Sequence, residues 1–385
     1  MGFEELHKQF EKKETDLSKL QKDKGFSRYI LIRSLDNDHV RDLIKANTKI
    51  GVTKNDSNYL WDTLFKSDVT QEQIIKYIRK KYPDVSKQRR EQEEYLPNII
   101  KEFDIVKCGI RNDNLNELTK DLVRDKTIKS KEDLEKKVNL VVNSTIKGYI
   151  LWQYYNQVTN DLIEHFFNDH KNVIPTLRKI TYVDFLIDKN NEIIPFDLKI
   201  THISDDYFDW HMKGLTNSAD GNDSYKVRDG KSELEVFKAK YKSLKNELKL
   251  PNYGGLDKEY MYKILLNNGD LRTKKIAEEL LLQRNKMINE IEKNPTSVEW
   301  WNYKFQGERL FKNNNRFFIF LAYKNSFEDA RPLKGNLELI KDKVNKKLDS
   351  IITDDLNNIR YYYNKEKRVE GAYQILSTSI LVTNS

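Results

Sequence analysis

Residues 182–200 read YVDFLIDKNNEIIPFDLKI. Two arms, Tyr182–Asp188 and Ile193–Ile200, are short and rich in β-branched and aromatic residues, a composition typical of strands. The segment between them, Lys189–Glu192, contains two asparagines, which favour tight turns because they tolerate the left-handed backbone conformation. The pattern therefore predicts an antiparallel β-hairpin.

The predicted hairpin brings two acidic residues together. A turn centred between Asn190 and Asn191 places Asp184 directly opposite Asp197, with their Cβ atoms about 5 Å apart on one face. Lys199 follows Asp197 at the spacing that returns a side chain to the same face. Opposed carboxylates repel each other unless a cation neutralises them, and two carboxylates can share one divalent cation. We therefore expect a metal site on this face.

The residue types on this face suit the hydrolysis of a phosphodiester. That reaction needs an activated water, a neutralised transition state and a stabilised leaving oxygen, and bound Mg²⁺ can supply all three. We expect Asp184, Asp197 and the backbone carbonyl of Leu198 to hold Mg²⁺, which prefers hard oxygen ligands and keeps several waters. Lys199 is expected beside the attacking water, where its ammonium orients and acidifies that water or offsets charge on the phosphate.

A further carboxylate is expected from the helix that leads into the hairpin. Residues Ile146–Phe167 carry apolar and aromatic side chains at helical spacing, which predicts one long helix. Packed on the sheet, it can direct Glu164, or Asp161 a turn earlier, toward the two aspartates. Glu164 is therefore a candidate catalytic residue, and the alternative is that it is a surface acid.

The composition favours a polyanionic partner without identifying it. The 385 residues include 68 Lys and Arg and 60 Asp and Glu, a formal net charge of +8. Cations that contact phosphates bind nucleic acid in a salt-dependent way; alternatively, the charge reflects only a lysine-rich and asparagine-rich chain. The single cysteine, Cys108, forms no internal disulfide, and Met1–Gln9 has no apolar run typical of a secretory signal. We expect a cytoplasmic protein without a membrane span.

Residues 1–140 predict a helical domain with charged faces. Thr70 and Gln73 match a capping box that opens a basic helix, Gln73–Tyr82, which Pro83 is expected to stop.

This basic helix follows another predicted helix, Asn58–Phe65, so the pair is a candidate helix-turn-helix that lays its second helix against DNA. Arg79 and Lys80 are then candidate DNA contacts. The alternative is a solvated amphipathic helix that packs through Ile74, Ile75 and Ile78.

Residues 141–385 are expected to form an α/β (α+β) domain, in which a mixed β-sheet is flanked by helices. A helical insertion is expected at about residues 203–298. Its cluster of Asp205, Asp206, Asp209 and His211 is interpreted as a solvated loop rather than a second metal site. The segments expected after the insertion are a helix near Trp300, a polar linker at Asn313–Arg316, a buried strand at Phe317–Tyr323, and β-rich stretches at Arg360–Tyr363 and Gln374–Val382.

The spacing from Asp184 to the sequence Asp197-Leu198-Lys199 resembles the PD-(D/E)XK nuclease superfamily, whose fold many restriction endonucleases share. The resemblance covers about residues 145–325. It implies a restriction endonuclease-like core, with Asp184, Asp197 and Lys199 in the catalytic positions and Glu164 in the optional helical one.

Two positions depart from the family pattern. Val183 replaces a frequent proline, and the second acid is Asp197 instead of the commoner glutamate. The segment after the insertion looks like the helix and strand that follow the active site in several type II restriction enzymes. By this resemblance Gln306, Arg309 and Arg316 become candidate DNA contacts, and structural salt bridges are the alternative for the two arginines.

Three functions remain open at this point. The leading prediction is a Mg²⁺-dependent type II restriction endonuclease that cuts double-stranded DNA at specific sequences, with a homodimer for a palindromic target and a cognate DNA methyltransferase as its genetic partner. A repair, recombination or phage-defence nuclease of the same fold, which recognises DNA structure, is the nearest alternative. A non-catalytic DNA-binding regulator is the alternative from another class.

Overall fold

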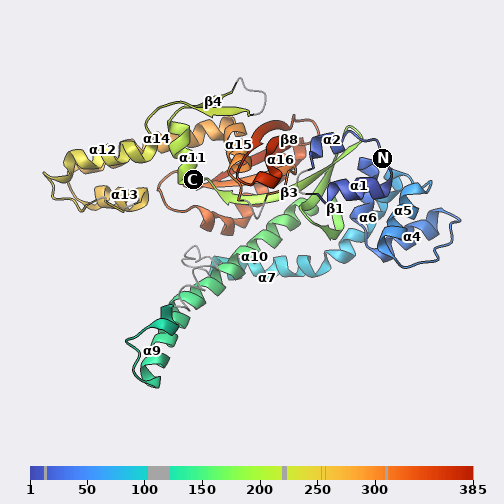
Figure 1. Ribbon diagram of the computed structural model, residues 1–385, viewed down its shortest axis with the longest axis horizontal. Helices are drawn as coiled ribbons and strands as arrows, with labels where there is room; N and C mark the ends of the chain where they lie inside the picture. Colours follow the sequence, from blue (N-terminus) through green and yellow to red (C-terminus); the bar gives the residue numbers. More distant parts are fainter. Residues whose placement is uncertain are drawn as a thin grey trace.

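The computed structural model describes residues 1–12, 15–102, 121–218, 223–252, 254–255, 257–307 and 311–384. At its centre lies a six-stranded mixed sheet with the order β1-β2-β3-β6-β8-β7 (Figure 1). The pairs β3–β6 and β6–β8 are parallel, and the other neighbours are antiparallel. The strands are β1 (Val173–Ile180), β2 (Val183–Lys189), β3 (Glu192–His202), β6 (Arg316–Ala322), β7 (Asn357–Tyr363) and β8 (Gly371–Thr383), and a separate pair is β4 (Leu215–Asn217) with β5 (Tyr225–Val227).

The predicted hairpin is formed by β2 and β3. Asn190 and Asn191 have φ angles of 56° and 64°, so both adopt the left-handed conformation that the favoured two-residue hairpin turn requires. β2 begins at Val183 and not at Tyr182, because Tyr182 (φ 63°) belongs to the turn after β1.

The register predicted from the sequence is confirmed. The pairing of β2 with β3 runs from the turn to Phe185 opposite Phe196. One step further along both strands, this register carries Asp184 to the position opposite Asp197. The side chains of the two aspartates therefore emerge on the same face of the sheet.

Helices α10 (Lys147–Asn168) and α16 (Leu337–Ser350) cover the other face. Phe167 of α10 packs against Phe185 and Phe317, with ring centroids 4.9 and 4.7 Å apart. The long helix predicted before the hairpin is therefore confirmed, and its apolar stripe packs on the sheet.

The face that carries the aspartates is covered by two groups of helices. The N-terminal group covers β1 to β3 and shares one core with sheet residues such as Leu186 and Ile193. The second group packs on the other half of the sheet, around Phe318 and Phe320. The first group is α1 (Phe3–Phe10), α2 (Leu17–Leu20), α3 (Phe26–Arg33), α4 (Asn37–Asn47), α5 (Ser57–Lys66) and α6 (Gln71–Val85), and the second is α11 (Asp205–Met212), α14 (Leu271–Lys293) and α15 (Thr296–Lys304).

The basic helix differs from its prediction at its end. The capping box of Thr70 and Gln73 is present, but α6 continues through Pro83 to Val85. Proline this close to the end of a helix removes one backbone hydrogen bond and leaves little helix to disrupt. Ile74 and Ile78 of α6 are buried in the N-terminal core, so α6 packs as the amphipathic alternative described.

Two sets of helices extend from this body in Figure 1. One contains α9 (Lys131–Val141), the π-helical turn η1 (Val142–Ile146) and the first half of α10, with α7 (Lys87–Lys101) beside α10. The other is the predicted insertion, in which α12 (Glu233–Lys245), α13 (Lys258–Asn267) and part of α14 enclose a small core together with Phe327, which follows β6. Arg331–Gly335 and Lys367–Val369 form two short 3₁₀ helices. Within the described ranges, no helix is long and apolar enough to cross a membrane.

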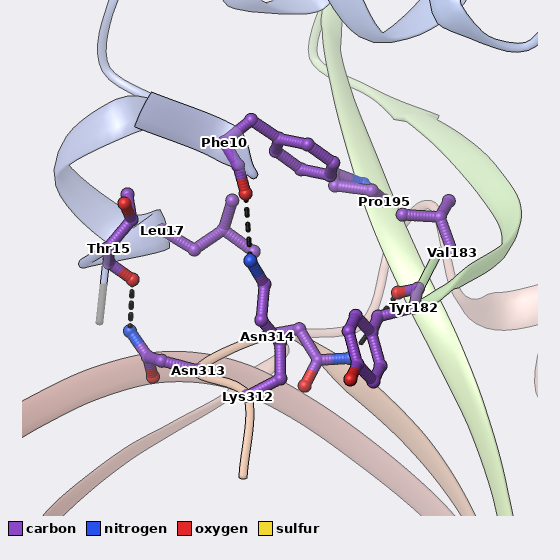
Figure 2. A pocket seen from close by; sticks show the side chains of 9 residues that line it. All are labelled: Phe10, Thr15, Leu17, Tyr182, Val183, Pro195, Lys312, Asn313 and Asn314. Carbon is purple, nitrogen blue, oxygen red and sulfur yellow. Dashed lines mark hydrogen bonds between the residues drawn. The ribbon is translucent and has the colours of Figure 1, made fainter. Parts of the chain in front are cut away.

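Of the segment predicted as a polar linker, Arg316 is the first residue of β6. The rest, with Lys312 before it, is buried at the seam between the N-terminal helices and the hairpin (Figure 2). Lys312 Nζ donates to the carbonyls of Phe10 and Lys12 at 2.8 and 2.7 Å, and Asn313 Nδ2 donates to Thr15 O at 3.1 Å. These contacts close a cavity of about 10 Å³, about the size of one water. The linker is therefore a hydrogen-bonded spacer that ties the first helices to the sheet.

Candidate functional site

The two aspartates lie where the β2–β3 pairing ends. Asp184 Oδ2 accepts a hydrogen bond from the backbone N–H of Leu198 at 2.7 Å, so the backbone of β3 is bonded to a side chain of β2. Burial raises the pKa of Asp184 to about 6, and the negative charge of Asp197 adds to this shift, while the Leu198 N–H opposes it. A cation that binds beside a half-buried carboxyl with a raised pKa lowers that pKa, because the cation stabilises the charged form.

Asp197 has a cation beside it. Arg316 occupies the neighbouring position on the parallel strand β6, and its Nε lies 3.0 Å from Asp197 Oδ2. The Nη2 of Arg316 also donates to Gln306 Oε1 at 3.1 Å. Arg316 is only 6% exposed, so this arrangement favours the salt-bridge interpretation of that arginine.

Lys199 shares the face of Asp197 and is exposed toward a cleft. Its ammonium has no ion pair or hydrogen bond with any residue of the described chain. The protein atoms around the ammonium desolvate it in part and lower the pKa of Lys199, and the charge of Arg316 lowers it further, while Asp197 opposes the shift. A free lysine with a lowered pKa is suited to orient a water or exchange a proton.

The cleft beside Lys199 has a volume of about 620 Å³. It lies between the sheet, α11 and the end of α15, and we call it the lysine cleft. Its lining includes Lys199, Trp210, Trp301, Phe305, Arg316 and Lys365.

Glu164 lies on the other side of the aspartates. It is half-buried on α10, and burial raises its pKa to about 7, with further contributions from the charges of Asp184 and Asp161. The structure thus brings Glu164 toward Asp184, whereas Asp161 Oδ2 pairs with Arg89 Nη2 at 3.1 Å. A pocket of about 290 Å³, which we call the glutamate pocket, includes Glu164, Asp184, Lys179, Arg89, His165 and Tyr82 in its lining.

The carboxylate and backbone oxygens near Asp184 and Asp197 are of the hard type that Mg²⁺ prefers as ligands. In the described ranges, no three His, Cys, Asp or Glu side chains are grouped so as to hold a metal ion, so the site offers the carboxylates of Asp184 and Asp197 and backbone oxygens. The N–H of Leu198 points to Asp184, and its carbonyl projects to the same side, as in any strand residue. Mg²⁺ is often held by one or two carboxylates, with waters and substrate phosphate filling the remaining positions.

The candidate DNA contacts have different surroundings. Arg309 lies outside the described residues. Gln306 is 9% exposed and its side-chain oxygen is taken by Arg316. Arg79 and Lys80 are exposed on α6, and the end of that helix borders the glutamate pocket.

Two features of the site were not anticipated from the sequence. Lys179, on the unpredicted strand β1, opposes the rise in the pKa values of Glu164 and Asp184 through its charge. The acidic cluster after β3 is the helix α11 and not a solvated loop, because Asp205 pairs with the buried side chains of Lys258 and Arg284. The sequence did contain a signal for Lys179: it is a basic residue within a short apolar segment that directly precedes the hairpin with the two aspartates.

No protein-family model, curated protein or solved structure matches this chain.

Proposed function

We propose that the protein is a Mg²⁺-dependent nuclease that hydrolyses phosphodiester bonds in double-stranded DNA at specific sequences, as a type II restriction endonuclease does. The observation that carries the proposal is the convergence of Asp184, Asp197 and Lys199 on one face, at the point where the β2–β3 pairing ends. The order α10, β1, β2, β3, α15, β6 around that point also supports a restriction endonuclease-like core.

Each residue has a role that follows from its surroundings. Asp184, Asp197 and the carbonyl of Leu198 would hold Mg²⁺, which when bound activates water and neutralises phosphate charge. Lys199, which has no ion pair or hydrogen bond among the described residues, would hold the attacking water beside the acid pair. Arg316 fixes Asp197 by an ion pair, so that this carboxylate keeps its orientation.

The two hollows suit a polymeric substrate. Lys199 lines the lysine cleft and Asp184 lines the glutamate pocket. Asp197 is linked to both, because it pairs with Arg316 of the lysine cleft and its charge raises the pKa of Asp184. A DNA strand that crosses this face would pass the lysine cleft, with its cationic side chains, on one side and the two aspartates in the middle. Exposed Arg79 and Lys80 on α6 extend the basic surface and are proposed as backbone contacts.

Incubation of the purified protein with unmethylated phage DNA tests the proposal. Mg²⁺ should give discrete fragments, and EDTA or Lys199→Ala should abolish them. Lys171→Ala is the matched control. Lys171 precedes β1, is 76% exposed and pairs with Asp349, and it lies at the opposite end of the strands from the acid pair. A smear in place of fragments would favour the structure-directed repair, recombination or phage-defence nuclease.

Intact DNA together with a gel shift in EDTA would replace the nuclease with the regulator. The homodimer and the DNA methyltransferase partner belong to the same proposal. Light scattering on the purified protein, alone and with DNA, measures the mass and tests the dimer separately from cleavage.

A further inference from the structure

One wall of the lysine cleft is aromatic. The ring centroid of Trp210 on α11 lies 5.3 Å from that of Trp301 and 5.4 Å from that of Phe305, and the last two rings are 4.1 Å apart. Trp210 and Phe305 remain partly exposed. The three rings therefore form a continuous aromatic surface toward the cleft. A wall that contacts only water does not need such a surface.

Cations flank this aromatic surface. Lys199 of β3 also lines the cleft, and so does Lys365, whose Nζ is 5.5 Å from the Phe305 ring centroid and 2.9 Å from the Phe305 carbonyl. Asp206 is the one acidic side chain among the described residues of the lining. The indole N–H of Trp210 has no hydrogen-bond partner in the described chain and is free to donate to a ligand.

Aromatic rings interleaved with lysines are the components of sites for single-stranded nucleic acid, where bases stack on rings and cations follow the backbone. The cleft volume of about 620 Å³ is that of a pocket for a small ligand. A base within a duplex is stacked on both sides and must be unpaired or rotated out to enter such a pocket.

We propose that the lysine cleft binds an unpaired nucleobase of the DNA strand, stacked on Trp210 beside Phe305, with the adjoining phosphates near Lys199 and Lys365. The inference deepens the proposed function, on which it rests, by assigning an extrahelical or single-stranded nucleotide to this cleft. Asp206 supplies an acceptor for a base amino group, such as that of cytosine.

Binding to a fluorescein-labelled oligothymidylate, followed by fluorescence anisotropy in EDTA, tests the inference without cleavage. Trp210→Ala should weaken binding by about 5- to 150-fold, the range that base–aromatic stacking contributes, and Trp210→Phe should weaken it less because a ring remains. Tyr260→Ala is the matched control, since Tyr260 is an aromatic residue 54% exposed on α13 and should change nothing.

Lys365→Ala keeps the test decisive if the tryptophan variant fails to fold. Lys365 is exposed, and its loss should lower the slope of log affinity against log salt by about 0.7, the contribution of one contact to a single strand. Affinities of Trp210→Phe and Lys365→Ala equal to that of the wild type would overturn the inference.

The two proposals fail separately. A protein that cuts DNA with Mg²⁺ but binds the oligonucleotide independently of Trp210 and Lys365 retains the nuclease function and loses the nucleobase site. A protein that binds through these residues but leaves DNA intact retains the nucleobase site and loses the nuclease function.

Discussion

Arg316 Nε lies 3.0 Å from Asp197 Oδ2, and the two residues occupy neighbouring positions on the parallel strands β3 and β6. The arginine is buried, and its second contact is the side-chain oxygen of Gln306. The candidate acid pair is therefore asymmetric. Asp197 has a permanent cation, whereas Asp184 has a backbone N–H, so the site contains one neutralised carboxylate and one that benefits from an incoming cation.

Removal of this buried arginine should destabilise the fold. Arg316→Met leaves the Asp197 charge without its partner, and breaking a buried ion pair costs about 3–5 kcal/mol. Urea denaturation measures the free energy of unfolding. The double variant Arg316→Met/Asp197→Leu should recover much of the loss, because no unpaired charge remains. Lys66→Ala, which breaks an exposed pair with Asp62, should cost less than about 1 kcal/mol. Equal losses in Arg316→Met and Lys66→Ala would show that the buried pair contributes no more than a surface one.

The Mg²⁺ requirement should depend on pH through Asp184, whose pKa is about 6. A carboxyl must lose its proton before it binds a cation. We expect the Mg²⁺ concentration for half-maximal cleavage to be constant above about pH 7 and to rise by about tenfold per pH unit below 6. Asp188→Asn, at the other end of β2, should leave this profile unchanged. A requirement that stays constant from pH 5 to 8 would remove Asp184 from the set of metal ligands.

Local patterns in the sequence were sufficient for the hairpin, the long helix and the buried strand β6. Each is specified by its own residues, such as the two asparagines of the turn. β1 was not among the predicted strands. Pro175 lies within it, and proline within a run of residues argues against a strand. β1 is at the edge of the sheet, where the missing N–H of a proline is tolerated.

Pairings between distant segments could not be read from the sequence. Arg316 and Asp197 are 119 residues apart, with the whole insertion between them. Likewise, Lys312 reaches the carbonyl of Phe10 over 302 residues, so a segment that is polar in composition is buried. Charge patterns indicate which residues need partners, but only the packed sheet determines which partners they find.

Glu164 should make the fold less stable as pH rises. Its pKa is raised to about 7, and a carboxyl whose pKa is higher in the folded than in the unfolded state stabilises the fold while it is protonated. This contribution is complete below about pH 4.5 and is lost as pH rises through 7; Asp184 acts in the same direction through pH 6. In EDTA, the free energy of unfolding of Glu164→Gln should therefore fall less between pH 5 and 8 than that of the wild type.

The control for this experiment is Glu338→Gln, because Glu338 is 88% exposed and should keep the wild-type profile. If Glu164→Gln also follows the wild-type curve, Glu164 is ionised freely and does not lie in the desolvated environment beside Asp184.

The hairpin turn should be sensitive to β-branched residues. Asn191 has a φ of 64°, and a side chain that is not asparagine, aspartate or glycine pays about 1–2 kcal/mol for the left-handed conformation. Asn191→Val should therefore lower the free energy of unfolding by about that amount. The matched control is Glu192→Val, one residue later in β3, where valine suits the strand. If both valines have the same effect, the left-handed conformation at position 191 has no measurable cost for valine.

The basic helix α6 should contribute to DNA affinity without reading its sequence. Arg79 and Lys80 are exposed and have no ion pair in the described part of the chain, so each is free to contact a phosphate. The double variant Arg79→Ala/Lys80→Ala should weaken binding to all duplexes alike and reduce the slope of log affinity against log salt by about 2. Lys274→Ala/Lys275→Ala removes the same charge from the exposed face of α14 and should leave that slope unchanged. Weaker binding to one sequence only would instead mean that α6 contacts bases, as the helix-turn-helix interpretation requires. Equal effects of the two double variants would mean that only the net charge of the protein matters and that Arg79 and Lys80 make no specific contact with DNA.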